Sequence, residues 1–104
     1  MNLLQETIEE LEGLGKSPKD VLWVGCIKDK WSDYEVQFNG VISWEEFVKI
    51  ADIEYNEDFG MVEISLDLVI VGNDWWLERN EYDGSECWAF KVLPRKKYYM
   101  EKEN

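Results

Sequence analysis

The stretch Met61–Pro94, MVEISLDLVIVGNDWWLERNEYDGSECWAFKVLP, decides the fold. Apolar residues alternate with polar ones from Val62 to Ile70, which is the period of a half-buried strand. Two turn signals follow, Gly72-Asn73-Asp74 and Asp83-Gly84, and both suit the positive φ of tight hairpins. Pro94 ends the run because proline cannot donate to a ladder. The sequence therefore predicts a three-stranded antiparallel meander.

The second turn also sets the register of the last two strands. If Asp83 and Gly84 are the two turn residues, counting outward places Arg79 opposite Trp88 and Leu77 opposite Phe90. One face of the predicted sheet then collects the side chains that we expect in the core. These are Leu66, Leu68, Ile70, Trp75, Leu77, Trp88, Phe90 and Val92.

The other face of the meander is mixed, because it holds apolar, polar and charged residues together. It carries Trp76 beside Lys91, within reach of a cation–π contact. One pair speaks against this register, since Glu81 lies opposite Glu86 and like charges across a ladder destabilise a sheet. A longer loop at the turn would remove that conflict.

Two helices are predicted before the meander. Residues Asn2–Glu12 carry Leu4, Ile8 and Leu11 on one stripe, and glutamates fill the other face. The pattern Ser43-Trp44-Glu45-Glu46 is a capping box, and it opens a second helix with an apolar stripe of its own. We expect the second helix to pack on the core face of the meander.

Short strands are predicted between the two helices. Val21–Ile27 is an apolar run with a β-branched bias, and Tyr34–Phe38 alternates apolar with polar residues. The dipeptide Asn39-Gly40 is a strong turn signal, so we expect the chain to pair back across it. Residues 1–104 should thus form one α+β domain, with the meander extended by one or two N-terminal strands and two helices packed on one face. A charged tail at residues 95–104 is expected to fray.

The charge of the chain limits its partners. The sequence holds 23 acidic and 11 basic residues, a net charge of −12. Such a chain repels phosphates and lacks the basic footprint that nucleic acids or anionic membranes require, so we expect it to bind neither. Its field attracts a basic partner, although in the alternative interpretation the acidic residues only aid solubility. With no apolar run of about 18 residues, and an acidic N-terminus that does not have the pattern of a signal peptide, we expect no membrane-spanning segment.

Ordinary catalysis has little support in the sequence. There is no histidine, which removes the usual general base, the Ser-His and Cys-His pairs and the commonest metal ligand. The acidic run Asp52–Asp58 lacks the glycine and the carboxylate spacing of a calcium loop. Cys26 and Cys87 have no metal-binding spacing and are expected to be reduced and buried. We therefore expect no enzyme activity, no cofactor and no metal.

The segment Asp67–Phe90, DLVIVGNDWWLERNEYDGSECWAF, resembles small uncharacterised proteins of phages and mobile elements of Gram-positive bacteria. The match is strongest at Trp75–Arg79 and at Glu81–Glu86, and it weakens toward the N-terminus. The resemblance implies a protein that acts in the cytoplasm of an infected or lysogenic host, and it brings no assigned activity or site residues. By size and charge alone the chain is also similar to anti-CRISPR and nuclease-immunity proteins, which present carboxylates where phosphates would bind.

These observations lead to one main hypothesis: a non-enzymatic inhibitor that binds the basic groove of a nuclease or another nucleic-acid-handling protein. Carboxylates would mimic phosphates, and exposed aromatic side chains would anchor the contact. The candidate partner-binding residues are Glu6, Glu9, Glu10, Glu12, Trp31, Glu54, Glu57, Asp58, Trp76, Tyr82 and Asp83. Two alternatives stay open. One is a module that binds a nucleotide or sugar in an aromatic pocket, and the other is a homodimer closed by the second sheet face, with Val69, Val71 and Trp76.

Overall fold

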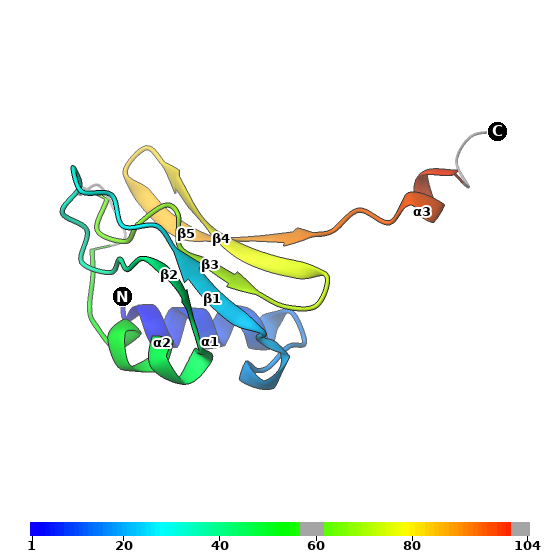
Figure 1. Ribbon diagram of the computed structural model, residues 1–104, viewed down its shortest axis with the longest axis horizontal. Helices are drawn as coiled ribbons and strands as arrows, with labels where there is room; N and C mark the ends of the chain where they lie inside the picture. The colour runs from blue at the N-terminus through cyan, green and yellow to red at the C-terminus, as the bar shows by residue number, and fades with distance from the viewer. Residues whose placement is uncertain (57–61, 101–104) are drawn as a thin grey trace.

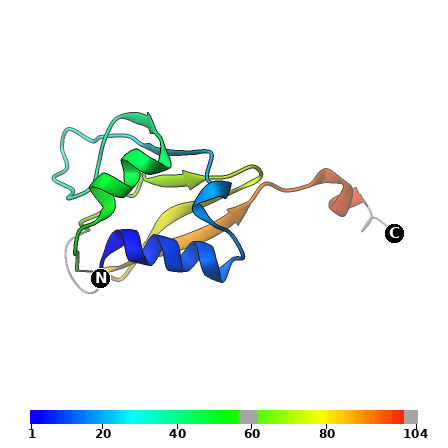
Figure 2. The ribbon, with the colours of Figure 1, turned by 90° about the horizontal axis from the view of Figure 1, so that it is seen from below.

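The computed structural model describes residues 1–56 and 62–100, which form a five-stranded antiparallel sheet with helices against one face (Figures 1 and 2). The elements are α1 (Leu3–Gly13), the 3-10 helix η1 (Pro18–Asp20), β1 (Trp23–Cys26), β2 (Gly40–Ile42), α2 (Trp44–Ala51), β3 (Val69–Val71), β4 (Trp75–Tyr82), β5 (Ser85–Val92) and α3 (Lys96–Met100). The strands lie in the order β2-β1-β3-β4-β5. The predicted α+β class is confirmed, because β3, β4 and β5 form a meander that β1 and β2 extend.

The β4–β5 hairpin has the register that its turn predicts. Its ladder runs from the pair Trp75–Val92 at the open end to the pair Tyr82–Ser85 beside the turn. The turn residue Asp83 has a φ of 53° and the glycine after it a φ of 87°, the two positive values that a type I′ turn requires. Because a two-residue turn allows one register only, it determines every residue pair of the β4–β5 ladder.

The two glutamates that spoke against this register are accommodated by separate hydrogen bonds. Glu81 Oε1 accepts a bond of 2.8 Å from the backbone N–H of Gly84. Glu86 turns into the protein, where its carboxylate accepts bonds of 3.0 and 3.1 Å from the backbone N–H groups of Glu63 and Ile64. Since each carboxylate has its own donors, the pair needs no longer loop.

The core lies between the sheet and the two helices α1 and α2, which cover the same face (Figure 2). Its fully buried members include Leu3, Leu11, Val24, Phe47, Ala51, Ile70 and Leu77. Trp75 and Trp88 are buried as predicted, with 5% and 7% of their surface exposed. The Trp75 ring lies over Gly72, where an added Cβ would come within 2.0 Å of it. The position therefore has room only for glycine.

The beginning of the meander differs from the prediction. β3 covers only Val69–Val71, whereas the alternation predicted a strand from Val62 onward. Ile64 instead forms an isolated parallel bridge with Val36, and the backbone turns at residues 65–68 before β3 begins. In the first half of the alternating segment, Ile64 therefore pairs with Val36 and not with β4, because the turn at residues 65–68 separates it from β3.

Several smaller predictions are also wrong. Leu66 at this turn and Val92 at the end of β5 are 43% and 50% exposed, so neither belongs to the core. Tyr34–Phe38 forms no strand beyond its one bridge. The chain does not pair back across Asn39, since β2 joins β1 instead and the Asn39 side chain accepts a bond of 2.7 Å from the backbone N–H of Lys28.

The two cysteines differ in burial because they lie on opposite faces of the sheet. Both are free, and Cys26 is buried under the helices as predicted. Cys87 is exposed, so the expectation that both would be buried is wrong. Cys87 alternates with the buried Trp88 along β5 and therefore points to the face that the helices leave open.

The chain beyond β5 extends away from the sheet to the short helix α3 (Figure 1). At its base the Arg95 guanidinium donates to the carboxylate of Asp74 at 2.8 Å. The predicted frayed tail at residues 95–104 thus begins with an anchored arginine and a helix, and its last four residues lie outside the described part of the chain.

Candidate functional site

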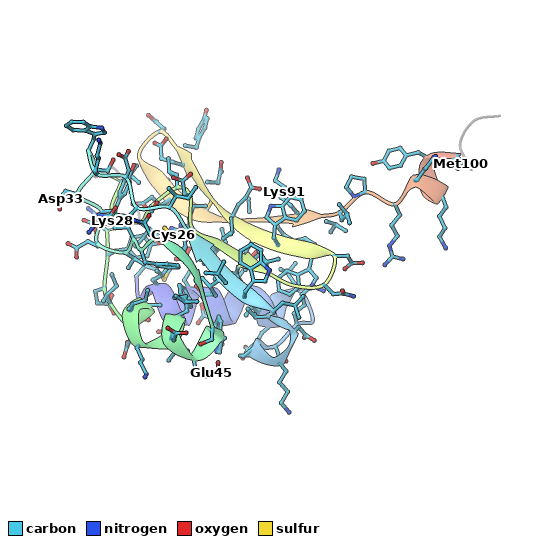
Figure 3. The ribbon with its side chains drawn as sticks, in the orientation of Figure 1. Cys26, Lys28, Asp33, Glu45, Lys91 and Met100 are labelled. Atoms are coloured by element: carbon cyan, nitrogen blue, oxygen red, sulfur yellow. The ribbon has the colours of Figure 1, made fainter. Side chains whose placement is uncertain are left out.

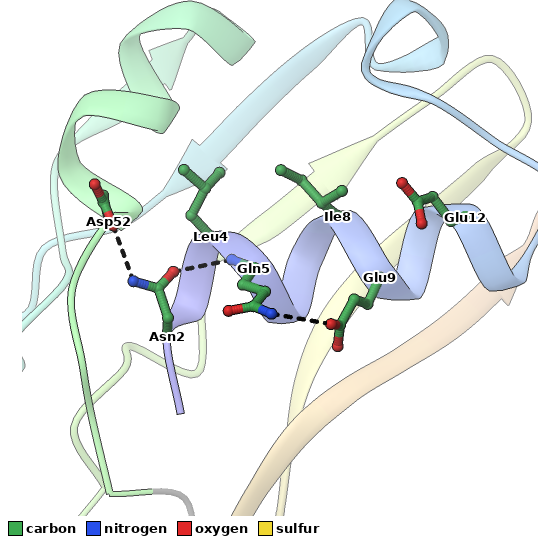
Figure 4. Close-up of a pocket in the computed structure, with 7 residues that line it drawn as sticks. All are labelled: Asn2, Leu4, Gln5, Ile8, Glu9, Glu12 and Asp52. Atoms are coloured by element: carbon green, nitrogen blue, oxygen red, sulfur yellow. Dashed lines mark hydrogen bonds between the residues drawn. The ribbon is translucent and has the colours of Figure 1, made fainter.

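A groove of about 450 Å³ runs along α1 beside the C-terminal end of α2 (Figure 4). Its lining residues come from α1 and from the residues that flank the two helices: Asn2, Leu4, Gln5, Ile8, Glu9, Glu12 and Asp52. Asn2 is the N-cap of α1, since its Oδ1 accepts a bond of 2.9 Å from the backbone N–H of Gln5. Its amide also donates to Asp52 Oδ1 at 2.9 Å. One residue thus ends the groove and ties the two helices together.

The groove exists because α1 turns a different stripe toward the sheet than the sequence predicts. The buried stripe consists of Leu3, Thr7 and Leu11. Thr7 is satisfied in the core, because its hydroxyl donates to the Leu3 carbonyl at 2.7 Å and accepts from the Trp88 indole N–H at 3.0 Å. Leu4 and Ile8, predicted to be core residues, are only half-buried and lie in the groove.

Two rows of side chains give the groove its chemistry (Figure 4). Leu4, Ile8 and Glu12 point to one side of α1, at the i, i+4, i+8 spacing of a helix face. Gln5 and Glu9 form the adjacent row and share a hydrogen bond of 3.2 Å. The exposed carboxylates of Glu9, Glu12 and Asp52 therefore surround two aliphatic side chains. Such a surface suits a segment that offers an apolar group flanked by Lys or Arg.

The other predicted carboxylates do not join this groove. Glu6 points inward, and its side chain is only 15% exposed. Glu10 is half-buried on α1, and Glu54 is exposed, with its Oε2 at 3.3 Å from the amino group of Met1. Glu57 and Asp58 lie outside the described residues. The structure therefore groups Glu9 and Glu12 with Asp52, which was not among the predicted partner-binding residues.

The predicted aromatic contacts are spread over the surface and do not line the groove. Trp31 is 85% exposed in the loop after β1, with Lys30 Nζ at 5.0 Å from its ring, so it does not fold back onto the core. Tyr82 is 80% exposed beside Asp83 at the tip of the β4–β5 hairpin. Trp76 is half-buried on the open face of the sheet, and its indole N–H donates to Glu78 at 2.7 Å. The hairpin tip and the loop after β1 lie at the end of the molecule opposite α3 (Figures 1 and 2).

A buried charge cluster under α1 was missed in the sequence. The Arg79 guanidinium, with its side chain 1% exposed, lies 3.5 Å from Glu6 Oε1 and 3.9 Å from Glu86 Oε1. It donates to the Tyr55 hydroxyl at 3.0 Å and stacks on the Trp88 ring at 4.6 Å. The predicted register already placed Arg79 opposite Trp88 on the core face. An arginine at a position predicted to be buried is the sequence feature that could have indicated this cluster.

Tyr55 completes this cluster and has a perturbed acidity. Its hydroxyl donates to Glu6 Oε1 at 2.5 Å, and only 5% of the residue is exposed. Burial raises the pKa of Tyr55 well above its ordinary value, and the hydrogen bond to Glu6 raises it further, while Arg79 lowers it. The cluster is enclosed, so we assign it to holding α1, β4 and residues 63–64 together rather than to chemistry with a ligand.

Comparison with known proteins adds no family to this description. No protein-family model, curated protein or solved structure matches the chain. Within residues 1–56 and 62–100, no group of three or more His, Cys, Asp or Glu side chains is placed to hold a metal ion. In the same residues, no helix has both the length and the apolar character needed to cross a membrane.

Proposed function

We propose that this protein is a non-enzymatic inhibitor that binds a basic, nucleic-acid-handling protein through the groove along α1. The observation that carries the proposal is the combination of exposed carboxylates from Glu9, Glu12 and Asp52 around the aliphatic side chains of Leu4 and Ile8. A basic segment of the partner would place its cations against the carboxylates and an apolar group against the floor. By filling the partner's basic surface, the protein would exclude nucleic acid from it.

The charge of the whole chain supports the same reading. A net charge of −12 on 104 residues steers a basic partner toward the protein and accelerates encounter at low salt. The apolar floor supplies what charge alone lacks, namely a contact that discriminates between basic partners. Action in the cytoplasm of a phage-infected host is part of this proposal, and it rests on the resemblance of Asp67–Phe90 to phage proteins.

The test compares two variants that remove the same charge. Glu9→Gln with Glu12→Gln removes two of the three carboxylates of the groove, whereas Glu35→Gln with Glu45→Gln removes two exposed carboxylates elsewhere. Each protein is used to capture partners from lysates of Gram-positive bacteria, and the affinity of a captured basic protein is then measured directly. We expect about tenfold weaker binding for the groove variant alone, from two rim charges worth about 0.5–1 kcal/mol each.

Two further measurements complete the test. The affinity for the partner should fall as the salt concentration rises, and the bound partner should no longer bind nucleic acid in a competition assay. Equal binding by both double variants would overturn the role of the groove. Binding that is independent of salt, or a ternary complex with nucleic acid, would overturn the proposed inhibition.

A further inference from the structure

The face of the sheet that points away from α1 and α2 forms a second surface, which we call the outer face. The register places the side chains of neighbouring strands in rows across it, from β1 and β2 through β3 to β4 and β5. Its apolar members are Trp23, Val41, Val69, Val71, Trp76 and Ala89. No helix of the described chain covers it (Figures 1 and 2). Figure 3 shows Lys91 on this side and Glu45 of α2 on the other.

A tryptophan on β1 lies against the backbone of the outer face. Trp23 does not project from it, because its ring lies across Gly25, where an added Cβ would come 2.6 Å from the ring and 3.4 Å from Val69. Trp23 is still 37% exposed, and Val41 on the edge strand β2 is 66% exposed. Two sheets that pack face to face bury the side chains of their facing surfaces between them, and this part of the outer face is apolar.

The outer face is also nearly free of the charge that dominates the rest of the protein. Among its residues in the five strands, only Glu78 and Lys91 are charged, and Glu78 is bonded to the Trp76 indole. The two are diagonal neighbours, because Lys91 pairs with Trp76 while Glu78 pairs with Ala89. A two-fold axis parallel to the sheet and midway between them would set Lys91 of each copy opposite Glu78 of the other. The face is therefore complementary to itself in charge.

We infer that the protein forms a two-fold dimer in which the outer faces of two copies pack against each other. Five strands of three to eight residues, spaced about 4.8 Å apart, offer roughly 400 Å² per copy, which is below the area of a standard stable interface. The dimer should therefore be weak, with a dissociation constant on the order of 10 µM. It buries neither the groove along α1 nor its carboxylates, so it is independent of the proposed function.

Sedimentation equilibrium over a wide concentration range tests this inference. The mass should rise from 12.4 kDa toward twice that value as the protein is concentrated. Because two copies of charge −12 repel each other, dimerisation should become about tenfold tighter between 50 and 500 mM salt. This is the reverse of the salt dependence expected for a basic partner. A protein that stays monomeric at about 500 µM in high salt would overturn the inference.

Matched variants locate the interface. Val71→Glu adds a charge to the outer face close to the proposed two-fold axis and should raise the dissociation constant at least tenfold, because the new carboxylate would be buried without a partner. Ile50→Glu is the control, since Ile50 is 38% exposed on α2 at the helical side. If Val71→Glu dimerises like the unmodified protein, or if Ile50→Glu is the variant that fails, the outer face is not the interface. Circular dichroism confirms that each variant is folded.

A charge exchange tests the two-fold pairing itself. Glu78→Lys and Lys91→Glu should each weaken the dimer severalfold, although the first lowers the net negative charge and so reduces general repulsion. The double variant restores opposite charges and should recover the dissociation constant to within about threefold. A double variant as weak as the worse single variant would overturn the pairing, as would a Glu78→Lys protein that dimerises more tightly.

Discussion

Replacing the buried arginine by methionine should show how much the charge cluster contributes to stability. In the Arg79→Met variant the Glu86 carboxylate, 1% exposed, would remain in the interior without its cation. Glu6 and the Tyr55 hydroxyl would lose the same partner, while methionine preserves much of the apolar contact with Trp88. Removing one member of a buried ion pair typically costs about 3–5 kcal/mol. We expect a loss in that range.

Urea unfolding, followed by tryptophan fluorescence and by circular dichroism, measures this loss through linear extrapolation. The control is Arg95→Met, which makes the same chemical change. Arg95 pairs with Asp74 at 2.8 Å, a shorter contact, but its side chain is 55% exposed. Exposed pairs contribute about 0–1 kcal/mol, so the control should unfold close to the unmodified protein. The shorter but exposed Arg95–Asp74 pair should therefore contribute less to the free energy of unfolding than the longer, buried pair of Arg79.

A double-mutant cycle decides whether the cost arises from the stranded carboxylate. Glu86→Gln removes that charge, and its one carbonyl oxygen can still accept from one of the two N–H groups, of Glu63 and Ile64, that the carboxylate binds. If our reasoning is right, Arg79→Met costs less in the Glu86→Gln background, by about 1–3 kcal/mol. Strict additivity of the two changes, or a loss below about 1 kcal/mol for Arg79→Met alone, would refute it.

Two further predictions concern single side chains. Folding raises the pKa of Tyr55, mainly by burial, so this side chain should not affect stability below its unfolded-state pKa of about 10. Above that pH the stability should decline, because the unfolded state loses the proton more readily. Tyr55→Phe should lack this part of the decline in urea midpoint. Gly72→Ala would place a methyl group 2.0 Å from the buried Trp75 ring and should cost about 1–3 kcal/mol. Gly25→Ala meets Trp23 at 2.6 Å, but that ring is 37% exposed and can swing outward, so its effect on the urea midpoint should be clearly smaller.

The part of the fold that sequence predicts well is the part with local determinants. A two-residue turn at Asp83 fixes every pair of the β4–β5 ladder, because the side chains alternate strictly from the turn outward. The capping box of α2 likewise forms as predicted, with the Glu46 backbone N–H bonded to Ser43 Oγ at 3.1 Å. Both signals act within a few residues, so no knowledge of the rest of the chain is needed.

The errors concern long-range partners. The alternation from Val62 predicted one strand up to β3, whereas Ile64 pairs with Val36 in an isolated bridge and a turn follows it. No local pattern identifies that partner. The conflict between Glu81 and Glu86 was overestimated for the same reason. Glu86 is neutralised by Arg79 and by backbone donors outside the hairpin, and a count of cross-strand charges does not include them.

The phase of α1 shows how such a long-range partner also creates the candidate site. Leucines at positions 3, 4 and 11 and an isoleucine at position 8 allow two apolar stripes, and the sequence favours the one without a threonine. In the structure the Trp88 indole N–H needs an acceptor in the core, and Thr7 supplies it. The helix orientation that allows this bond also turns Leu3 and Leu11 inward and leaves Leu4 and Ile8 beside Glu9 and Glu12. The groove therefore lies on the face that α1 leaves outside when Leu3, Thr7 and Leu11 enter the core.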